Sequence, residues 1–141
     1  MAVNVGQRNV PDTPQNRGLI SLNKALNLSV HTIKICSNPK VFDEKYQKFI
    51  DKLVDCATNI FMSANTANNI RVTDEESKKT RLALEHKAII YCSNLLSYIN
   101  IAQRLFHVRG KKVSHWVGMT LDTRTLLGKW YKADKRRYKD F

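Results

Sequence analysis

Apolar residues recur every three or four positions through most of this chain, which is typical of helices that bury one face. Such patterns run from about Ile20 to Cys36, from about Pro39 to Asn68, from about Thr73 to His107 and from about Lys111 to Arg136. We find no segment with the apolar and polar alternation of a strand. Four long helices with short connections predict an all-α fold, an antiparallel up-down four-helix bundle.

The residues before the first helix have a different composition. Residues 1–18 contain two of the three prolines, two of the five glycines and few large apolar side chains. This composition favours a flexible N-terminal arm. The bundle domain, with its basic C-terminal end, is expected to occupy residues 19–141.

Each helix is expected to bury one apolar stripe. In the first helix the stripe is Leu22, Leu26, Val30 and Ile33. In the second it is Tyr46, Phe49, Leu53, Cys56, Ala57, Ile60, Ala64 and Ala67. In the third it is Leu84, Ala88, Cys92, Leu95, Ile99, Ala102 and Phe106. In the fourth it is Val113, Trp116, Val117, Leu127, Trp130 and Tyr131.

Local signals set the expected helix ends. Asn38 is expected to cap the second helix, with Pro39 at its first helical position. Thr73 and Glu76 have the spacing of a capping box for the third helix. Gly110 is expected to end that helix in the left-handed conformation.

The third helix also carries apolar residues outside its stripe, namely Ile90, Tyr98, Ile101 and Leu105. A helix with one solvated side would not expose so many apolar groups. A four-helix bundle rarely encloses one helix completely. The four residues are therefore predicted to form an interface with other copies of the chain.

The formal net charge is +12, and residues 101–141 contribute eleven Lys or Arg against three Asp. Unneutralised cations at this density indicate a polyanionic partner. Nucleic-acid binding is predicted for Lys111, Lys112, Lys129, Lys132, Lys135, Arg136, Arg137 and Lys139. No base-reading pattern accompanies them, so binding to backbone phosphates with little sequence preference is expected.

Aromatic residues lie between these cations. Trp116, Trp130 and Tyr131 fall on the core side of the fourth helix, where packing is favoured over base stacking. Tyr138 and Phe141 lie beyond the packed helix and are expected to be free to stack on bases.

Asp134 falls on the inward side of the same helix. A structural ion pair with Arg124 or Arg137 is the favoured interpretation.

The sequence offers little support for catalysis. Metal, dinucleotide, P-loop and hydrolase motifs are missing, and His31, His86, His107 and His115 have no ligand spacing. Cys36, Cys56 and Cys92 fit small buried hydrophobes, which favours a reducing compartment. No stretch approaches the roughly 18 apolar residues of a membrane span. A non-enzymatic, cytoplasmic protein without cofactor or metal is expected.

Other partners are compatible with a basic helical chain. The segment from Leu105 to Leu121 could act as a helix-turn-helix that binds DNA, provided that its second helix is short and exposed. The basic face of a purely structural oligomer could instead dock an acidic protein.

Several segments together resemble a known superfamily. They are the Asn38-Pro39 helix end, the run from Leu53 to Ile60 followed by Ala64-Asn65, the long third helix, and the run from Leu126 to Trp130. Over about Leu19 to Arg137 the chain is similar to small four-helix bundle proteins. These include proteins encoded in ribosomal RNA intervening sequences and the accessory variability determinant of diversity-generating retroelements. The strongly basic end favours the second branch.

That resemblance implies a function. Accessory variability determinants are basic homopentamers that bind nucleic acid and associate with the reverse transcriptase of the retroelement. The polymerase needs them to make mutagenic cDNA from template RNA, and it supplies the catalytic carboxylates and metal. The resemblance therefore implies three partners for this chain: a reverse transcriptase, template RNA or cDNA, and further copies of itself.

Overall fold

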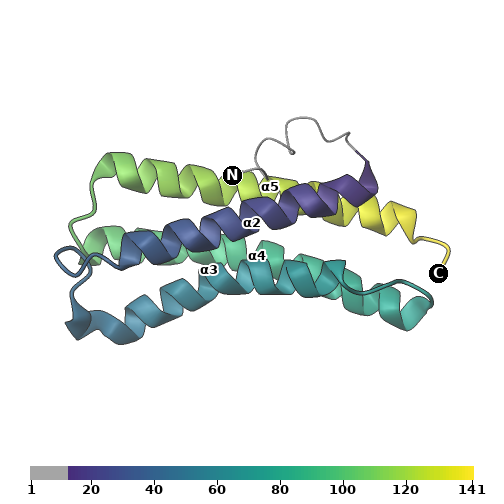
Figure 1. Cartoon of the computed structure of the whole chain (residues 1–141), viewed down its shortest axis with the longest axis horizontal. Coiled ribbons are helices and arrows are strands. Elements are labelled where there is room, and N and C mark those ends of the chain that lie inside the picture. Colours follow the sequence, from purple (N-terminus) through teal and green to yellow (C-terminus); the bar gives the residue numbers. More distant parts are fainter. Residues whose placement is uncertain (1–12) are drawn as a thin grey trace.

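The computed structural model of the protein describes residues 13–141. This part of the chain contains no strand and comprises the helices α2 (Pro14–Cys36), α3 (Gln47–Asn68), α4 (Glu75–Leu105) and α5 (Gly110–Arg137), with a short 3-10 helix η1 (Glu44–Tyr46) before α3. The four long helices pack together (Figure 1), which confirms the predicted all-α, four-helix fold. The arm predicted at residues 1–18 lies for the most part, residues 1–12, outside the described residues.

Each long helix packs against two others, in the order α2, α3, α4, α5 and back to α2. This arrangement leaves α2 and α4 at opposite corners of the bundle. In Figure 1 the connections 37–46 and 106–109 lie at one end, and the connection 69–74 and the C-terminus lie at the other. The two ends of α5 are therefore the two ends of the bundle.

Buried residues follow steps of three and four in α3, α4 and α5, which is the spacing of helices packed nearly in parallel with their neighbours. In α3 they include Ile50, Leu53, Ala57, Ile60, Ala64 and Ala67. In α4 they include Ala88, Cys92, Leu95, Ile99 and Ala102. In α5 they include Val113, Trp116, Thr120, Thr123, Leu127 and Trp130. The predicted stripes of the last three helices are confirmed in outline, although Tyr46 is exposed and Val117 and Tyr131 are half-buried.

The stripe predicted for the first helix is wrong except at Leu22, which is half-buried against the core. Leu26, Val30 and Ile33 are exposed, and the buried face of α2 consists mainly of small residues. The reason lies in α5, whose two tryptophans fill the space between the helices. Thr32 Oγ1, for example, accepts a hydrogen bond from the Trp116 indole at 3.0 Å. Large side chains on that face of α2 would compete with the indoles for the same volume.

The start of α2 is earlier than predicted. Thr13 caps the helix by accepting a hydrogen bond from the Asn16 amide at 3.3 Å, and Pro14 occupies the first helical position. The chain is therefore helical six residues before Ile20.

Two other helix starts differ from the prediction. The carbonyl of Asn38 accepts hydrogen bonds from the amides of Val41 and Phe42, so residues 37–43 form a turn and α3 begins only at Gln47. At α4 the capping box is one residue later than predicted, between Asp74 and Ser77.

Gly110 does not end α4. It is the first residue of α5, and no described glycine has a positive φ. The chain leaves α4 instead at Phe106, whose backbone is extended and whose buried ring packs on Phe42 with 4.5 Å between centroids. An apolar anchor therefore makes the turn for which glycine was expected.

Replacing Gly18 is expected to test the close contact between α2 and α5. A Cβ at Gly18 would lie 3.0 Å from Trp130 Nε1 and 3.0 Å from Asn68 Oδ1. We expect Gly18→Leu to lower the free energy of unfolding by about 1–3 kcal/mol, measured by urea denaturation. Gly128→Ala is the matched control, because no side chain or neighbouring element among the described residues lies within 4 Å of its Cβ position. This control should gain about 0.5–1 kcal/mol from helix propensity, and equal effects of the two substitutions would contradict the assignment.

Candidate nucleic-acid interface

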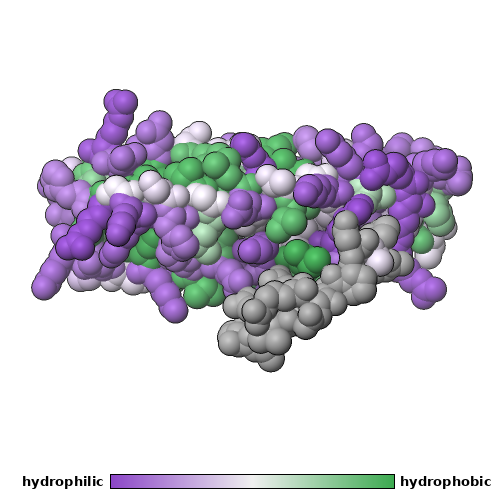
Figure 2. Space-filling view, turned by 90° about the horizontal axis from the view of Figure 1, so that it is seen from above, coloured by the Kyte–Doolittle hydropathy of each residue, from purple (hydrophilic) through white to green (hydrophobic). Residues whose placement is uncertain are grey.

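The eight cations predicted to bind nucleic acid are all exposed, but the structure divides them between the two ends of α5. Lys111 and Lys112 lie in its first turn, and the other six follow from Lys129 to Lys139 at its far end. The rise of a helix places Lys129 about 27 Å from Lys111 along the axis. On the face shown in Figure 2, hydrophilic side chains crowd both ends of the molecule and hydrophobic ones are exposed between them.

The cations at the C-terminal end form two groups. Lys129, Lys132 and Arg136 follow one another at three and four positions on the outward side of α5, and Lys139 comes after the helix end. We call these four residues the C-terminal basic stripe. Within the described part of the chain, none of the four has a carboxylate within ion-pair distance. Their charges are therefore available to a partner.

Lys135 and Arg137 are held by neighbouring rings instead. The Lys135 ammonium lies 5.3 Å from the centre of the Tyr131 ring. The Arg137 guanidinium lies 4.8 Å from the centre of the Tyr138 ring and 4.0 Å from Asp134 Oδ1. Lys135 and Arg137 therefore stabilise the fold through these ring contacts, and their charges are less available to a partner than those of the C-terminal basic stripe.

The fold brings further charges to this end that the sequence pattern did not indicate. Lys78 Nζ donates a hydrogen bond to the Phe141 carbonyl at 3.4 Å. Arg71 and Arg137 line a common hollow of about 420 Å³. The first turn of α4 also carries two acidic residues, Glu75 and Glu76, and Glu75 forms an ion pair with Lys79 at 3.3 Å. The outward side of α5 is therefore more strongly positive than its α4 side.

Tyr138 is not free to stack on a base, contrary to the prediction. Its side chain is 7% exposed and lies beside the guanidinium of Arg81, 5.5 Å from the ring centre. Phe141 packs edge-on against it with 5.8 Å between centroids but remains 49% exposed. Of the two predicted stacking residues, Phe141 alone offers a free ring face.

The C-terminal end of α5 is fixed to α4 by a buried ionic cluster. Arg81 Nε lies 2.9 Å from Asp134 Oδ2 and 3.2 Å from Glu85 Oε2, and its Nη1 donates to the Ile70 carbonyl at 2.9 Å. Of the two predicted partners of Asp134, Arg137 lies 4.0 Å from its Oδ1, whereas Arg124 contacts Ser93 at 3.3 Å. Asp134 thus has a close partner on another helix.

The sequence did contain a signal for this cluster. Stepping back from Ala88 by three and seven positions continues the α4 core stripe to Glu85 and Arg81. Charged residues at two successive core positions indicate a buried ion pair, and their i,i+4 spacing allows direct contact.

One guanidinium faces two carboxyl groups in this cluster. Burial, followed by the hydrogen bond to Asp134 and the charge of Asp134, raises the pKa of Glu85 from its ordinary value of 4.5 to about 10. Glu85 therefore holds a proton at neutral pH. Glu85 Oε1 and Asp134 Oδ1 have no hydrogen-bond partner among the described residues, so both oxygens are open to a shared proton.

The predicted self-association residues on α4 lie largely at the surface. Ile101 is 50% and Ile90 46% exposed, and Leu105 is also exposed. Tyr98 differs, because it is half-buried and its ring lies 5.9 Å from that of Phe49. The apolar surface of α4 therefore consists mainly of three aliphatic side chains.

The α4–α5 junction does not have the geometry of a helix-turn-helix. These helices comprise 31 and 28 residues, and Trp116 on the second is completely buried. A recognition helix must leave its reading face exposed. The sequence-based condition for this alternative, a short exposed second helix, is not met.

Residues 13–141 contain no cluster of three or more metal-ligating side chains, and none of the helices there combines the length and apolar character needed to cross a membrane. Comparison of the chain with protein-family models, with curated proteins and with solved structures finds no match.

Proposed function

We propose that this protein is a non-enzymatic, homo-oligomeric nucleic-acid-binding subunit that holds template RNA or cDNA for a reverse transcriptase. The observation that carries the proposal is the C-terminal basic stripe, whose cations lie exposed and without carboxylate partners. In the isolated protein the positive charges of the stripe repel one another. Bound phosphates neutralise these charges and release counterions, which favours binding. Its side chains offer charge rather than a base-reading pattern, which suits binding with little sequence preference.

A rigid support for the stripe is part of the proposal. We infer an up-down antiparallel bundle, in which each helix reverses the direction of the one before. Two contacts between α3 and α4 support this inference, because Phe49 contacts Tyr98 whereas the later residue Cys56 contacts the earlier residue Tyr91. A stripe on a long helix in such a bundle keeps its spacing when RNA binds.

Self-association is the second part of the proposal. Most of the large exposed apolar side chains among the described residues lie on two helices at opposite corners of the bundle. On α2 they are Leu19, Leu26, Val30 and Ile33, and on α4 they are Ile90, Ile101 and Leu105. Two different surfaces on opposite sides suit head-to-tail contacts, which close into a ring. A homopentamer is the ring that the family resemblance implies.

A ring would strengthen a weak phosphate affinity. Each subunit contributes one basic stripe, and simultaneous contacts raise the overall affinity by avidity without any new contact. The ring supports the RNA function because a single stripe of four cations offers few phosphate contacts.

We include a reverse transcriptase as a partner because two segments, residues 53–60 and residues 126–130, resemble accessory variability determinants. In this assignment the polymerase carries the catalytic carboxylates and metal, and this cytoplasmic chain carries RNA-binding surface. Proteins encoded in ribosomal RNA intervening sequences are the second branch of the resemblance. A reverse transcriptase gene beside the gene for this chain would distinguish the two.

Charge reversal tests the stripe. We expect the double variant Lys132→Glu with Arg136→Glu to bind single-stranded RNA at least about tenfold more weakly, and its plot of log affinity against log salt to be shallower by about two. Fluorescence anisotropy over a series of salt concentrations measures both quantities. Circular dichroism should show unchanged helicity.

The matched control reverses Lys48 and Lys52, two exposed cations on α3, which should leave RNA affinity nearly unchanged. Equal affinities of the stripe variant and the wild type at low and at high salt would refute the site. Displacement of the partner by heparin but not by RNA of matched length would favour an acidic protein as the ligand instead.

A further inference from the structure

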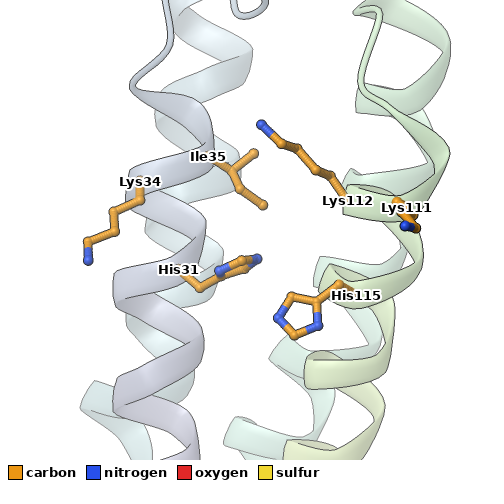
Figure 3. Close-up of a pocket in the computed structure, with 6 residues that line it drawn as sticks. All are labelled: His31, Lys34, Ile35, Lys111, Lys112 and His115. Carbon is orange, nitrogen blue, oxygen red and sulfur yellow. The ribbon is translucent and has the colours of Figure 1, made fainter. Parts of the chain in front are cut away.

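A second basic feature lies between α2 and α5, at the end of the bundle opposite the C-terminal basic stripe. It is a cleft of about 350 Å³, drawn in Figure 3. Its lining residues are His31, Lys34, Ile35, Lys111, Lys112 and His115. Two of these, Lys111 and Lys112, were predicted to bind nucleic acid, but the histidines and Lys34 were not.

The two histidines face each other across the cleft. Their rings lie 5.1 Å apart between centroids and meet edge to face at 80°. In Figure 3 the Lys112 side chain extends across the same gap toward Ile35, whereas Lys34 extends along the outer side of its helix. His31 on α2 and Lys112 and His115 on α5 thus line the same cleft.

The surroundings of the cleft are positive throughout. No carboxylate from the described residues lines it, and the adjoining hollow adds His107 and Arg109. Lys111 and Lys112 occupy the first turn of α5, which contains no acidic residue. Helix N-termini are already positive, so cations there are unfavourable for stability and favourable for an anion. A metal cation would be repelled from the same place.

His31 gives this site an unsatisfied polar atom. Its Nε2 is buried and has no hydrogen-bond partner among the described residues. Burial, then the charges of His115 and Lys34, lower the pKa of His31 below its ordinary value. The imidazole is therefore neutral at pH 7 and would gain both a proton and a partner if an anion entered.

We propose that the His31–His115 cleft is a phosphate-binding site, in which Lys112 and the two imidazoles hold one phosphate group. Phosphate fits better than a single carboxylate, because several oxygens can accept hydrogen bonds from donors on both helices at once. The inference rests on the proposed function in one respect, because the phosphate held in the cleft would belong to the bound nucleic acid. It deepens that function by giving each subunit a second contact, about 27 Å along α5 from the stripe.

Binding at this site is expected to depend on pH. The charged and titratable groups that face His31 are Lys34 on its own helix and Lys111, Lys112 and His115 on α5. The charges of His115 and Lys34 disfavour a proton on His31, and a bound phosphate would offset them. Affinity should therefore rise as the pH falls through the range in which His31 takes up its proton, because the bound phosphate favours the protonated imidazole.

The imidazole resonances of the full chain measure this directly. We expect inorganic phosphate, added at constant ionic strength, to shift the resonances of His31 and His115 in a saturable way. Sodium chloride and sodium acetate should produce no saturable shift. Acetate that acts as well as phosphate would overturn the proposal, and so would a linear response to every salt.

Two variants test the assignment of the donors. Lys112→Gln should weaken phosphate binding about tenfold, because it removes a charge-assisted hydrogen bond. His115→Gln should do the same but should leave a pH dependence at His31, because His31 is the group that takes up the proton. Lys52→Gln, on the exposed side of α3, is the matched control and should change nothing.

Oligonucleotides then identify the source of the phosphate. A 5′-phosphorylated RNA that shifts His31 at lower concentration than its 5′-hydroxyl twin assigns the site to a chain end, and equal effects assign it to the backbone. The variant with Lys132→Glu and Arg136→Glu separates the two sites, because it should retain phosphate binding at His31. Loss of RNA binding in that variant without any phosphate effect in the wild type would overturn the cleft alone. A phosphate effect with no loss of RNA binding would overturn the stripe alone.

Discussion

Replacing Arg81 with methionine is expected to lower the free energy of unfolding by about 3–5 kcal/mol. The substitution keeps much of the side-chain volume but leaves Asp134, which is completely buried, without its guanidinium partner at 2.9 Å. It also removes the hydrogen bond to the Ile70 carbonyl, which ties the α3–α4 connection to the cluster. Urea denaturation followed by circular dichroism measures the loss.

Glu85→Gln is expected to have the opposite outcome, although it changes a residue of the same cluster. Glutamine resembles a protonated glutamate, so the variant should be about as stable as the wild type at pH 5. The raised pKa means that the wild-type fold retains a proton that the unfolded chain releases above about pH 4.5. The contribution of Glu85 to the free energy of unfolding therefore falls as the pH rises from 4.5 toward 10. Glutamine does not titrate, so the variant does not lose this stability. Its advantage should grow with pH.

The exposed pair of Lys79 and Glu75 provides the control for both substitutions. Lys79→Met also removes one partner of an i,i+4 ion pair on α4, but both side chains are largely exposed. Its effect should stay below about 1 kcal/mol. An Arg81→Met effect as small as that of Lys79→Met would contradict the role of the cluster, and a strong loss in Glu85→Gln would contradict the proton on Glu85.

The position of the cluster connects it to the proposed function. Asp134 lies between Lys132 and Arg136 of the C-terminal basic stripe, and its contact with Arg81 fixes this part of α5 against α4. Loosening the cluster would therefore also disturb the stripe. RNA-binding losses in Arg81 variants cannot be assigned to a lost phosphate contact, since Arg81 is buried.

The sequence predicted the helices well where apolar size and burial coincide. In α4, large apolar residues such as Leu95 and Ile99 recur at helical spacing and are buried, so periodicity identified the core face. In α2 the two properties separate. Its exposed side bears Leu26 and Val30, while Ala25 on the other side is buried against the rest of the bundle. The hydrophobic pattern of one helix does not show how large the side chains of the neighbouring helices are, so it could not show that the tryptophans of α5 pack on the small residues of α2.

The same limit applies to the two candidate sites. The stripe was readable because Lys129, Lys132 and Arg136 lie on one helix at fixed spacing, and a wheel places them on one side. The cleft was not readable, because His31 and His115 are 84 positions apart in sequence and meet only when α2 packs on α5. Tyr138 was misplaced for a related reason: the sequence alone did not show that Arg81 would be buried beside it.

A mixing experiment should decide how the subunits assemble. We expect Ile101→Asp, on the apolar surface of α4, and Val30→Asp, on that of α2, each to convert the proposed oligomer to a monomer. Both side chains are exposed in the subunit, so the fold should tolerate the charge. Light scattering after size-exclusion chromatography measures the mass, and circular dichroism checks the helicity.

The outcome of mixing follows from the geometry of a head-to-tail contact. Each variant retains the surface that the other has lost, so an equimolar mixture has one intact pairing and no means of extending it. The mixture should therefore form a one-to-one dimer and nothing larger. A symmetric contact between two copies of α4 would give a different pattern, in which Val30→Asp assembles normally and mixing has no effect. If the ring provides avidity, the monomeric variants should also bind long RNA at least about a hundredfold more weakly than the wild type, although their basic stripes are unchanged.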